Sequence, residues 1–67
     1  MKIILNNREE DFDGDKLTVE EMLDRKKFTF KMRIVKINDR FIPKEKYNNT
    51  VIIDGDNVQM LYLMSGG

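Results

Sequence analysis

The chain contains no cysteine, no histidine and no tryptophan among its 67 residues, and it has a single proline. These absences exclude disulfide bridges, thiolate nucleophiles, zinc sites of the usual ligand type and a histidine general base. The acids and bases that remain are carboxylates, lysines, arginines and two tyrosines, which offer little from which to build an enzyme that works alone. We therefore expect a protein without catalytic residues of its own.

Long apolar runs are also absent. The apolar start of the chain is interrupted after five residues by Asn6, Asn7 and Arg8, so it is too short for the core of a signal peptide. No other segment approaches the length that spans a membrane. We expect a cytoplasmic protein with no membrane contact, formed by one domain near the lower size limit for folding without disulfides or a metal.

The charges sum to zero but are sorted along the chain. Residues 1–24 carry a net charge of −5, residues 25–46 carry +7, and residues 47–67 carry −2. Solvated faces of a small domain are the favoured interpretation, and a basic middle segment that meets an acidic partner protein is the alternative. Nucleic-acid binding is not expected, because the pI is about 6.2 and no aromatic ladder interleaves the basic residues.

The first half of the chain predicts a hairpin followed by a short helix. Residues 2–6 and 8–12 suit two strands joined by the turn-forming pair Asn6-Asn7. Thr18 and Glu21 then stand at the two positions of a capping box, which predicts a helix from Val19 to Lys26 or Lys27.

The second half predicts three further strands, at residues 32–37, 40–42 and 57–64. Pro43 ends the second of these because it has no N–H for a ladder, and one helical turn or a loop follows at 44–49. The order β-β-α-β-β-β with one helix implies an α+β roll whose helix covers one face of the sheet. The last strand is expected to project the end of the chain from a sheet edge.

The sequence ends in Ser65, Gly66 and Gly67, and a terminal glycine pair arises by chance in roughly one chain in two hundred. Glycine has no Cβ, so such a tail is thin enough to enter a narrow enzyme channel. The α-carboxylate of Gly67 is therefore a candidate reacting group. The alternative is an unstructured end without a function.

Two acidic segments resemble cation sites only superficially. The segment 11–15 has its glycine at loop position four instead of six, and no glutamate follows at position twelve, so it fails the EF-hand pattern. Residues 54–56 suit a hairpin-like turn that sets strand register. No metal site is expected.

Residues 37–44, I-N-D-R-F-I-P-K, are similar to the V-N-G-x-x-V-P-R segment of ThiS-type sulfur carriers. Tyr47, the turn at 54–56 and the apolar final strand ending in two glycines follow in the family's order, so the resemblance covers essentially the whole chain. Asp39 replaces glycine and Lys44 replaces arginine. The resemblance implies the ubiquitin-like β-grasp fold, with a mixed four- to five-stranded sheet in residues 1–64 and a flexible tail at 65–67.

The resemblance also implies a function in which the chain is the co-substrate of other enzymes. A ThiF-like adenylating enzyme would use ATP and Mg to adenylate the Gly67 carboxylate, and sulfur from a persulfide donor would convert it to a thiocarboxylate. That thiocarboxylate would give its sulfur to a ThiG-like thiazole synthase in thiamine biosynthesis. The chain itself would bind no cofactor and would be a monomer when free.

A surface for these partners is expected on the open face of the sheet. If alternate residues of the last strand face the helix, Leu61 and Leu63 point the other way, and Phe41 extends the apolar patch. Met64 and Ser65 are expected to follow the tail into the partner. The alternative is that a loop covers the leucines.

Three other functions stay open at this point. The chain suits a sulfur carrier for molybdopterin, cysteine or thiouridine, because the diglycine tail does not indicate which molecule accepts the sulfur. It also suits a ubiquitin-like modifier that is joined through Gly67 to lysines of other proteins. A third possibility is a β-grasp interaction module that never becomes thiocarboxylated.

Overall fold

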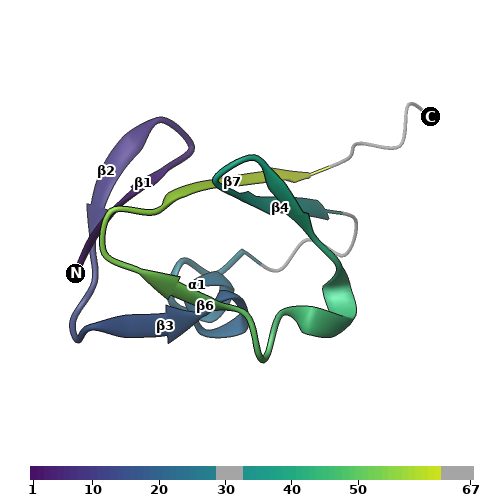
Figure 1. Cartoon of the computed structure of the whole chain (residues 1–67), viewed down its shortest axis with the longest axis horizontal. Coiled ribbons are helices and arrows are strands. Elements are labelled where there is room, and N and C mark those ends of the chain that lie inside the picture. Colours follow the sequence, from purple (N-terminus) through teal and green to yellow (C-terminus); the bar gives the residue numbers. More distant parts are fainter. Residues whose placement is uncertain (29–32, 63–67) are drawn as a thin grey trace.

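The computed structural model describes residues 1–28 and 33–62 (Figure 1). The elements in chain order are β1 (Lys2–Leu5), β2 (Arg8–Asp11), β3 (Lys16–Thr18), α1 (Val19–Arg25), β4 (Arg33–Ile37), β5 (Arg40–Ile42), the 3₁₀-helix η1 (Lys44–Lys46), β6 (Val51–Ile53) and β7 (Asn57–Tyr62). Within the described residues, the predicted hairpin, helix and remaining strands are confirmed to within a few residues of their expected bounds, and the helical turn or loop expected at 44–49 contains the 3₁₀-helix η1.

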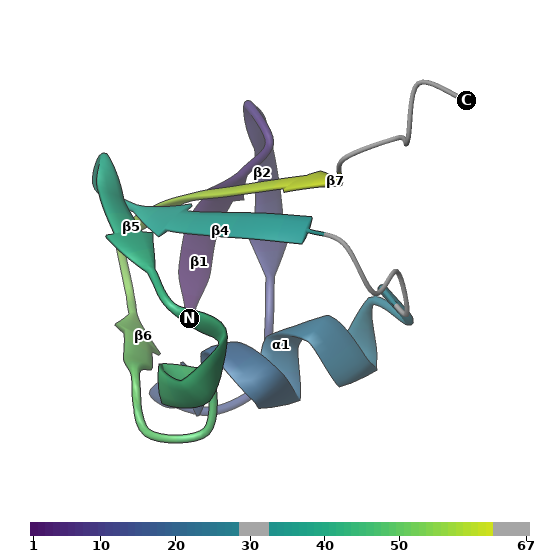
Figure 2. The same cartoon turned by 90° about the vertical axis from the view of Figure 1, so that its right-hand side faces the viewer.

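Five strands form one mixed sheet in the order β2-β1-β7-β4-β5. β1 and β7 run parallel, and the other neighbours are antiparallel. The helix α1 lies against one face of this sheet, which confirms the predicted β-grasp arrangement (Figure 2). The final strand is nevertheless the central strand, so the expectation that it lies at a sheet edge was wrong.

A second sheet of two strands, β3 and β6, was not predicted. Leu17 of β3 pairs with Ile52 of β6, and both side chains are buried. Each strand has only three residues, which is too short to show a period of two in the sequence. The small sheet lies beside α1 below the main sheet and closes that side of the core (Figure 1).

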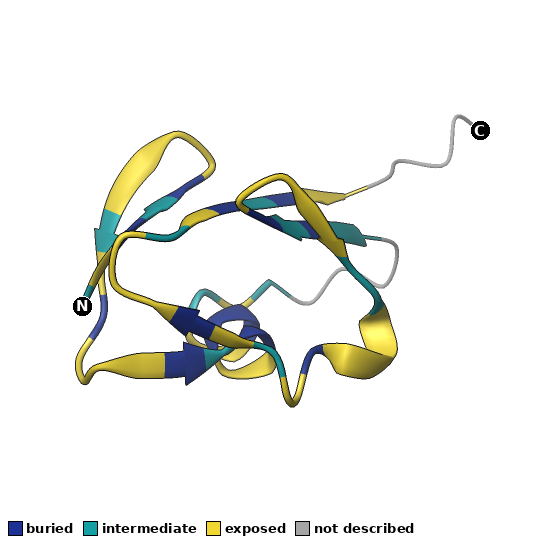
Figure 3. Cartoon of the chain, in the orientation of Figure 1, coloured by how far each residue is buried: buried dark blue, intermediate teal, exposed yellow. Residues whose placement is uncertain are grey.

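The core fills the space between the main sheet, the helix and the small sheet (Figure 3). Its largest fully buried side chains come from five different elements, and they are Ile3, Val19, Met22, Val35, Ile52 and Val58. Because every layer contributes to this one cluster, the small domain folds around a single core without a disulfide.

The helix begins with the predicted capping box. The Thr18 N–H donates to Glu21 Oε1 at 2.9 Å, and the Glu21 N–H donates to Thr18 Oγ1 at 3.1 Å. At the other end, Lys27 adopts a left-handed conformation with φ of 57°. The Phe28 N–H then reaches the Leu23 carbonyl at 2.9 Å, which closes the helix as a Schellman motif.

Two hairpins turn through left-handed residue pairs. Asn6 and Asn7 have φ of 51° and 67°, and Asn38 and Asp39 have φ of 50° and 68°. Two-residue loops of this kind match the twist of the strands they join. Asp39 therefore adopts the left-handed conformation for which the family pattern has glycine, as expected for an aspartate.

The capping box makes the stability of the fold depend on pH. The hydrogen bond from the Thr18 backbone lowers the pKa of Glu21, and the Thr18 side chain contributes in the same direction. Because the folded pKa is depressed, the stabilisation is present above the usual carboxyl range and is lost as pH falls through the folded pKa. We predict that Glu21→Gln lowers the unfolding midpoint at pH 7 and that the difference from the unsubstituted protein disappears in acid.

The measurement is urea unfolding of both proteins between pH 7 and pH 3. Glu20→Gln is the matched control, since Glu20 lies in the same first turn but is not the capping residue. If the unfolding midpoints of Glu21→Gln and the unsubstituted protein differ by the same amount from pH 7 to pH 3, the Glu21 carboxylate is not the source of the pH dependence.

Candidate functional site

The face of the main sheet that points away from α1 carries a compact group of side chains at the carboxyl end of β7. Strand register places Ile34 opposite Leu61, and it places Lys36 opposite both Gln59 and Phe41. Directly paired residues point to the same side of a sheet, so these five residues share one surface. We call them the open patch.

The open patch contains the two predicted partner-binding residues that the structure describes. Phe41 is 60% exposed and Leu61 is 52% exposed, so no described loop covers them. They lie on β5 and β7, on either side of β4. The prediction that both residues lie on the open face is confirmed, whereas their role in binding a partner stays a prediction.

The other predicted site residues lie outside the described part of the chain. These are Leu63, Met64, Ser65, Gly66 and Gly67, together with the predicted domain boundary between residues 64 and 65. What the structure establishes is the strand from which they continue. Tyr62, the last residue of β7, is 51% exposed.

Asn6 holds β7 two residues before its end. Its N–H donates to the Val58 carbonyl at 2.9 Å, and its Oδ1 accepts the Met60 N–H at 2.8 Å. The backbone of β1 turns away at Asn6, so the side chain supplies the acceptor that the next strand residue would otherwise provide.

Asn38 has a similar role at the start of β7. Its N–H donates to the Asn57 carbonyl at 2.7 Å, and its Oδ1 accepts the Asn57 N–H at 2.9 Å. Its Nδ2 also donates to Asp56 at 3.0 Å. The sequence predicted only turns at both asparagines, although an amide side chain beside a strand end indicates contacts of this kind.

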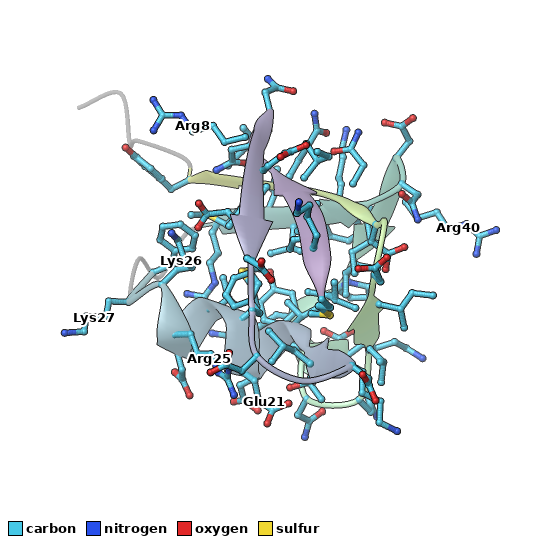
Figure 4. All side chains as sticks on the ribbon, turned by 90° about the vertical axis from the view of Figure 1, so that its left-hand side faces the viewer. Arg8, Glu21, Arg25, Lys26, Lys27 and Arg40 are labelled. Atoms are coloured by element: carbon cyan, nitrogen blue, oxygen red, sulfur yellow. The ribbon has the colours of Figure 1, made fainter. Side chains whose placement is uncertain are left out.

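The basic residues of segment 25–46 do not all lie on one surface of the described part of the chain. Arg25, Lys26 and Lys27 lie at the end of α1, while Arg40 lies on the far side of the molecule (Figure 4). Lys26 pairs with Glu10, which neutralises part of the helix end. The favoured interpretation as solvated faces therefore fits the described residues better than a single basic docking face.

The Arg33 guanidinium lies over the ring of Tyr47, 5.4 Å from its centroid. Tyr47, the aromatic residue of the family pattern, is buried in the core next to η1. A cation over an aromatic face is stabilised electrostatically. The family aromatic thus serves packing between η1 and the sheet, and it does not belong to the open patch.

Residues 1–28 and 33–62 bring together no group of three or more acidic side chains that is suited to hold a metal ion. In the same residues, no helix combines the length and the apolar character that crossing a membrane requires.

The model of the ThiS family matches residues 3–67 of the chain. The crystal structure of a thiamine biosynthesis protein (ThiS) from Geobacter metallireducens is 32% identical, covers both chains completely and superposes with a TM-score of 0.89. The NMR structure of a thiamine biosynthesis protein from the same organism is 32% identical with a TM-score of 0.80, covering all of this chain and 88% of that one. No curated protein matches the chain significantly.

The side chain of Asn6 offers a direct test of how β7 is held. Asn6→Gly keeps the left-handed backbone but removes the acceptor of the Met60 N–H, so we predict a loss of about 1–2 kcal/mol in unfolding free energy. Amide hydrogen exchange at Met60 should accelerate by the factor to which this loss of free energy corresponds. Asn7→Gly is the matched control, because Asn7 has the same backbone conformation and its side chain makes no hydrogen bond to a described residue.

Urea unfolding and NMR-detected exchange give the two readouts. If Asn6→Gly is as stable as Asn7→Gly, the side chain of Asn6 does not anchor the strand.

Proposed function

The chain belongs to the ThiS family, and we propose that it is the sulfur carrier of thiamine biosynthesis, with Gly67 as the residue that becomes thiocarboxylated. The observation that carries this proposal is the family match, because it extends through Gly66 and Gly67 and is not confined to the folded body. The likeness to the Geobacter metallireducens thiamine biosynthesis protein over the full length of both chains supports it.

The proposed chemistry begins with the activation of a carboxylate. A carboxylate is a poor electrophile, because its charge is delocalised over two oxygens and oxide is a poor leaving group. A ThiF-like adenylating enzyme, supplied with ATP and Mg, would join the Gly67 carboxylate to AMP and release pyrophosphate. The resulting acyl-adenylate has AMP as a good leaving group.

Sulfur then replaces AMP. A persulfide sulfur attacks the Gly67 carbonyl carbon, AMP leaves, and cleavage of the remaining S–S bond by a thiol leaves a thiocarboxylate. Sulfur is a better nucleophile than the oxygen it replaced, so the tail can deliver it to an electrophilic carbon held by a ThiG-like thiazole synthase. The carrier contributes no acid, base or metal to these steps, which fits a small carrier protein that is not an enzyme.

The folded body serves this chemistry by giving the tail a fixed origin. β7 pairs with β1 at Asn57 and Val58 and with β4 as far as Tyr62, and Asn6 holds it at Met60, so the end of the strand has a defined place in the sheet. Five residues follow Tyr62, and an extended chain of that length spans at most about 16–18 Å. That reach suffices for Gly67 to enter the active site of an enzyme that covers the open patch.

Intact-mass spectrometry tests the proposal. The protein is incubated with Mg-ATP, a persulfide sulfur donor and a ThiF-like enzyme, and the expected product has one oxygen exchanged for sulfur. Covalent ladders on other proteins would instead indicate a ubiquitin-like modifier. If neither product forms, the result indicates an interaction module and contradicts the proposal.

Substitutions in the tail test the role of its two glycines. We predict that deletion of Gly67, or Gly66→Phe, abolishes sulfur loading because a side chain collides with the walls of the channel that aligns the reacting groups. The thermal midpoint should stay unchanged. Asn49→Phe places the same side chain at an exposed position in the body and should load normally. Normal loading of the Gly66→Phe protein would refute the threading argument.

A further inference from the structure

Lys36 lies at the centre of the open patch. It is opposite Phe41 on one neighbouring strand and opposite Gln59 on the other. The next pair along the strands is Ile34 and Leu61, so the ammonium group is carried within a mainly apolar surface. Lys36 is partly buried.

The charge of Lys36 is not balanced from within the described part of the molecule. The ion pairs of residues 1–28 and 33–62 join Lys26 to Glu10 and the N-terminus to Asp11, and neither includes Lys36. The nearest carboxylates in the register of the same face are on β2, and β1 and β7 separate that strand from β4. Lys36 therefore places a lone positive charge in an apolar surface.

We propose that Lys36 recognises a carboxylate on the adenylating enzyme, within an apolar surface of that enzyme that covers Phe41 and Leu61. The inference rests on the proposed function and specifies the chemistry of the partner. An enzyme that holds Gly67 comes within about 16–18 Å of the end of β7, because only five residues follow Tyr62. Leu61 directly precedes Tyr62 on that strand, so the open patch lies within reach of the enzyme surface around the bound tail.

Desolvation of the ammonium group is the physical basis of this recognition. When an apolar surface covers Phe41 and Leu61, it also removes water from the ammonium group between them. An unpaired charge in that position would oppose binding, whereas a carboxylate opposite it forms a charge-assisted hydrogen bond at low effective dielectric. Lys36 therefore selects for partners with an acid at this point and against partners without one.

Steady-state adenylation kinetics with varied carrier concentration test the inference. We expect Lys36→Gln to raise KM about tenfold, which corresponds to about 1.4 kcal/mol. The value of kcat should not change, because the tail that reacts is unaltered. Lys36→Glu should raise KM further, and added salt should raise KM of the unsubstituted protein more than that of Lys36→Gln.

Two further variants separate charge from other effects. Lys36→Met keeps the length and apolar stem of the side chain, so it should show the same rise in KM even if glutamine disturbs packing. Lys16→Gln removes one positive charge from an exposed residue of the small sheet and should leave KM within twofold of the original value.

The outcomes distinguish this inference from the proposed function. If the unsubstituted protein is not adenylated at all, the proposed function fails. If it is adenylated while Lys36→Gln and Lys36→Met keep its KM within twofold, only the role of Lys36 is overturned. An equal rise for Lys16→Gln would also overturn it, because net charge would then explain the effect.

Discussion

The structure depends on the pairing of β7 along both of its sides. The strand lies between β1 and β4, so it contributes buried side chains to the core and joins the two hairpins into one sheet. Two asparagines from the hairpin turns complete its hydrogen bonds, Asn38 at the first residue and Asn6 at Met60. A strand held in this way fixes the position of Tyr62, the last residue of β7.

The alternation of side chains along β7 gives the main sheet an exposed apolar face. Val58 and Met60 point into the core, which leaves Gln59 and Leu61 on the opposite face. Phe41 lies on the same face, because it pairs with Lys36 of β4, the strand between β5 and β7. An exposed apolar surface of this kind is a frequent feature of protein interfaces, and here it includes Leu61, the residue before the end of β7.

Much of the fold could be predicted from local chemistry. The capping box, the asparagine turns and Pro43 act through neighbouring residues, and the alternation in the last strand gave the correct face for Leu61. The small sheet escaped prediction because its two strands have three residues each and pair across long sequence separation. The central place of β7 and the contacts of Asn6 depend on tertiary pairing, which periodicity does not encode.

The central claim is that this domain presents a terminal carboxylate on which sulfur is carried to the thiazole ring of thiamine. The most direct measurement loads the protein with labelled sulfur, removes the free donor, adds thiazole synthase with its substrates and follows the label. The account predicts that the label leaves the protein and appears in the thiazole product. Label that stays on the protein, or that reaches only other acceptors, would contradict it.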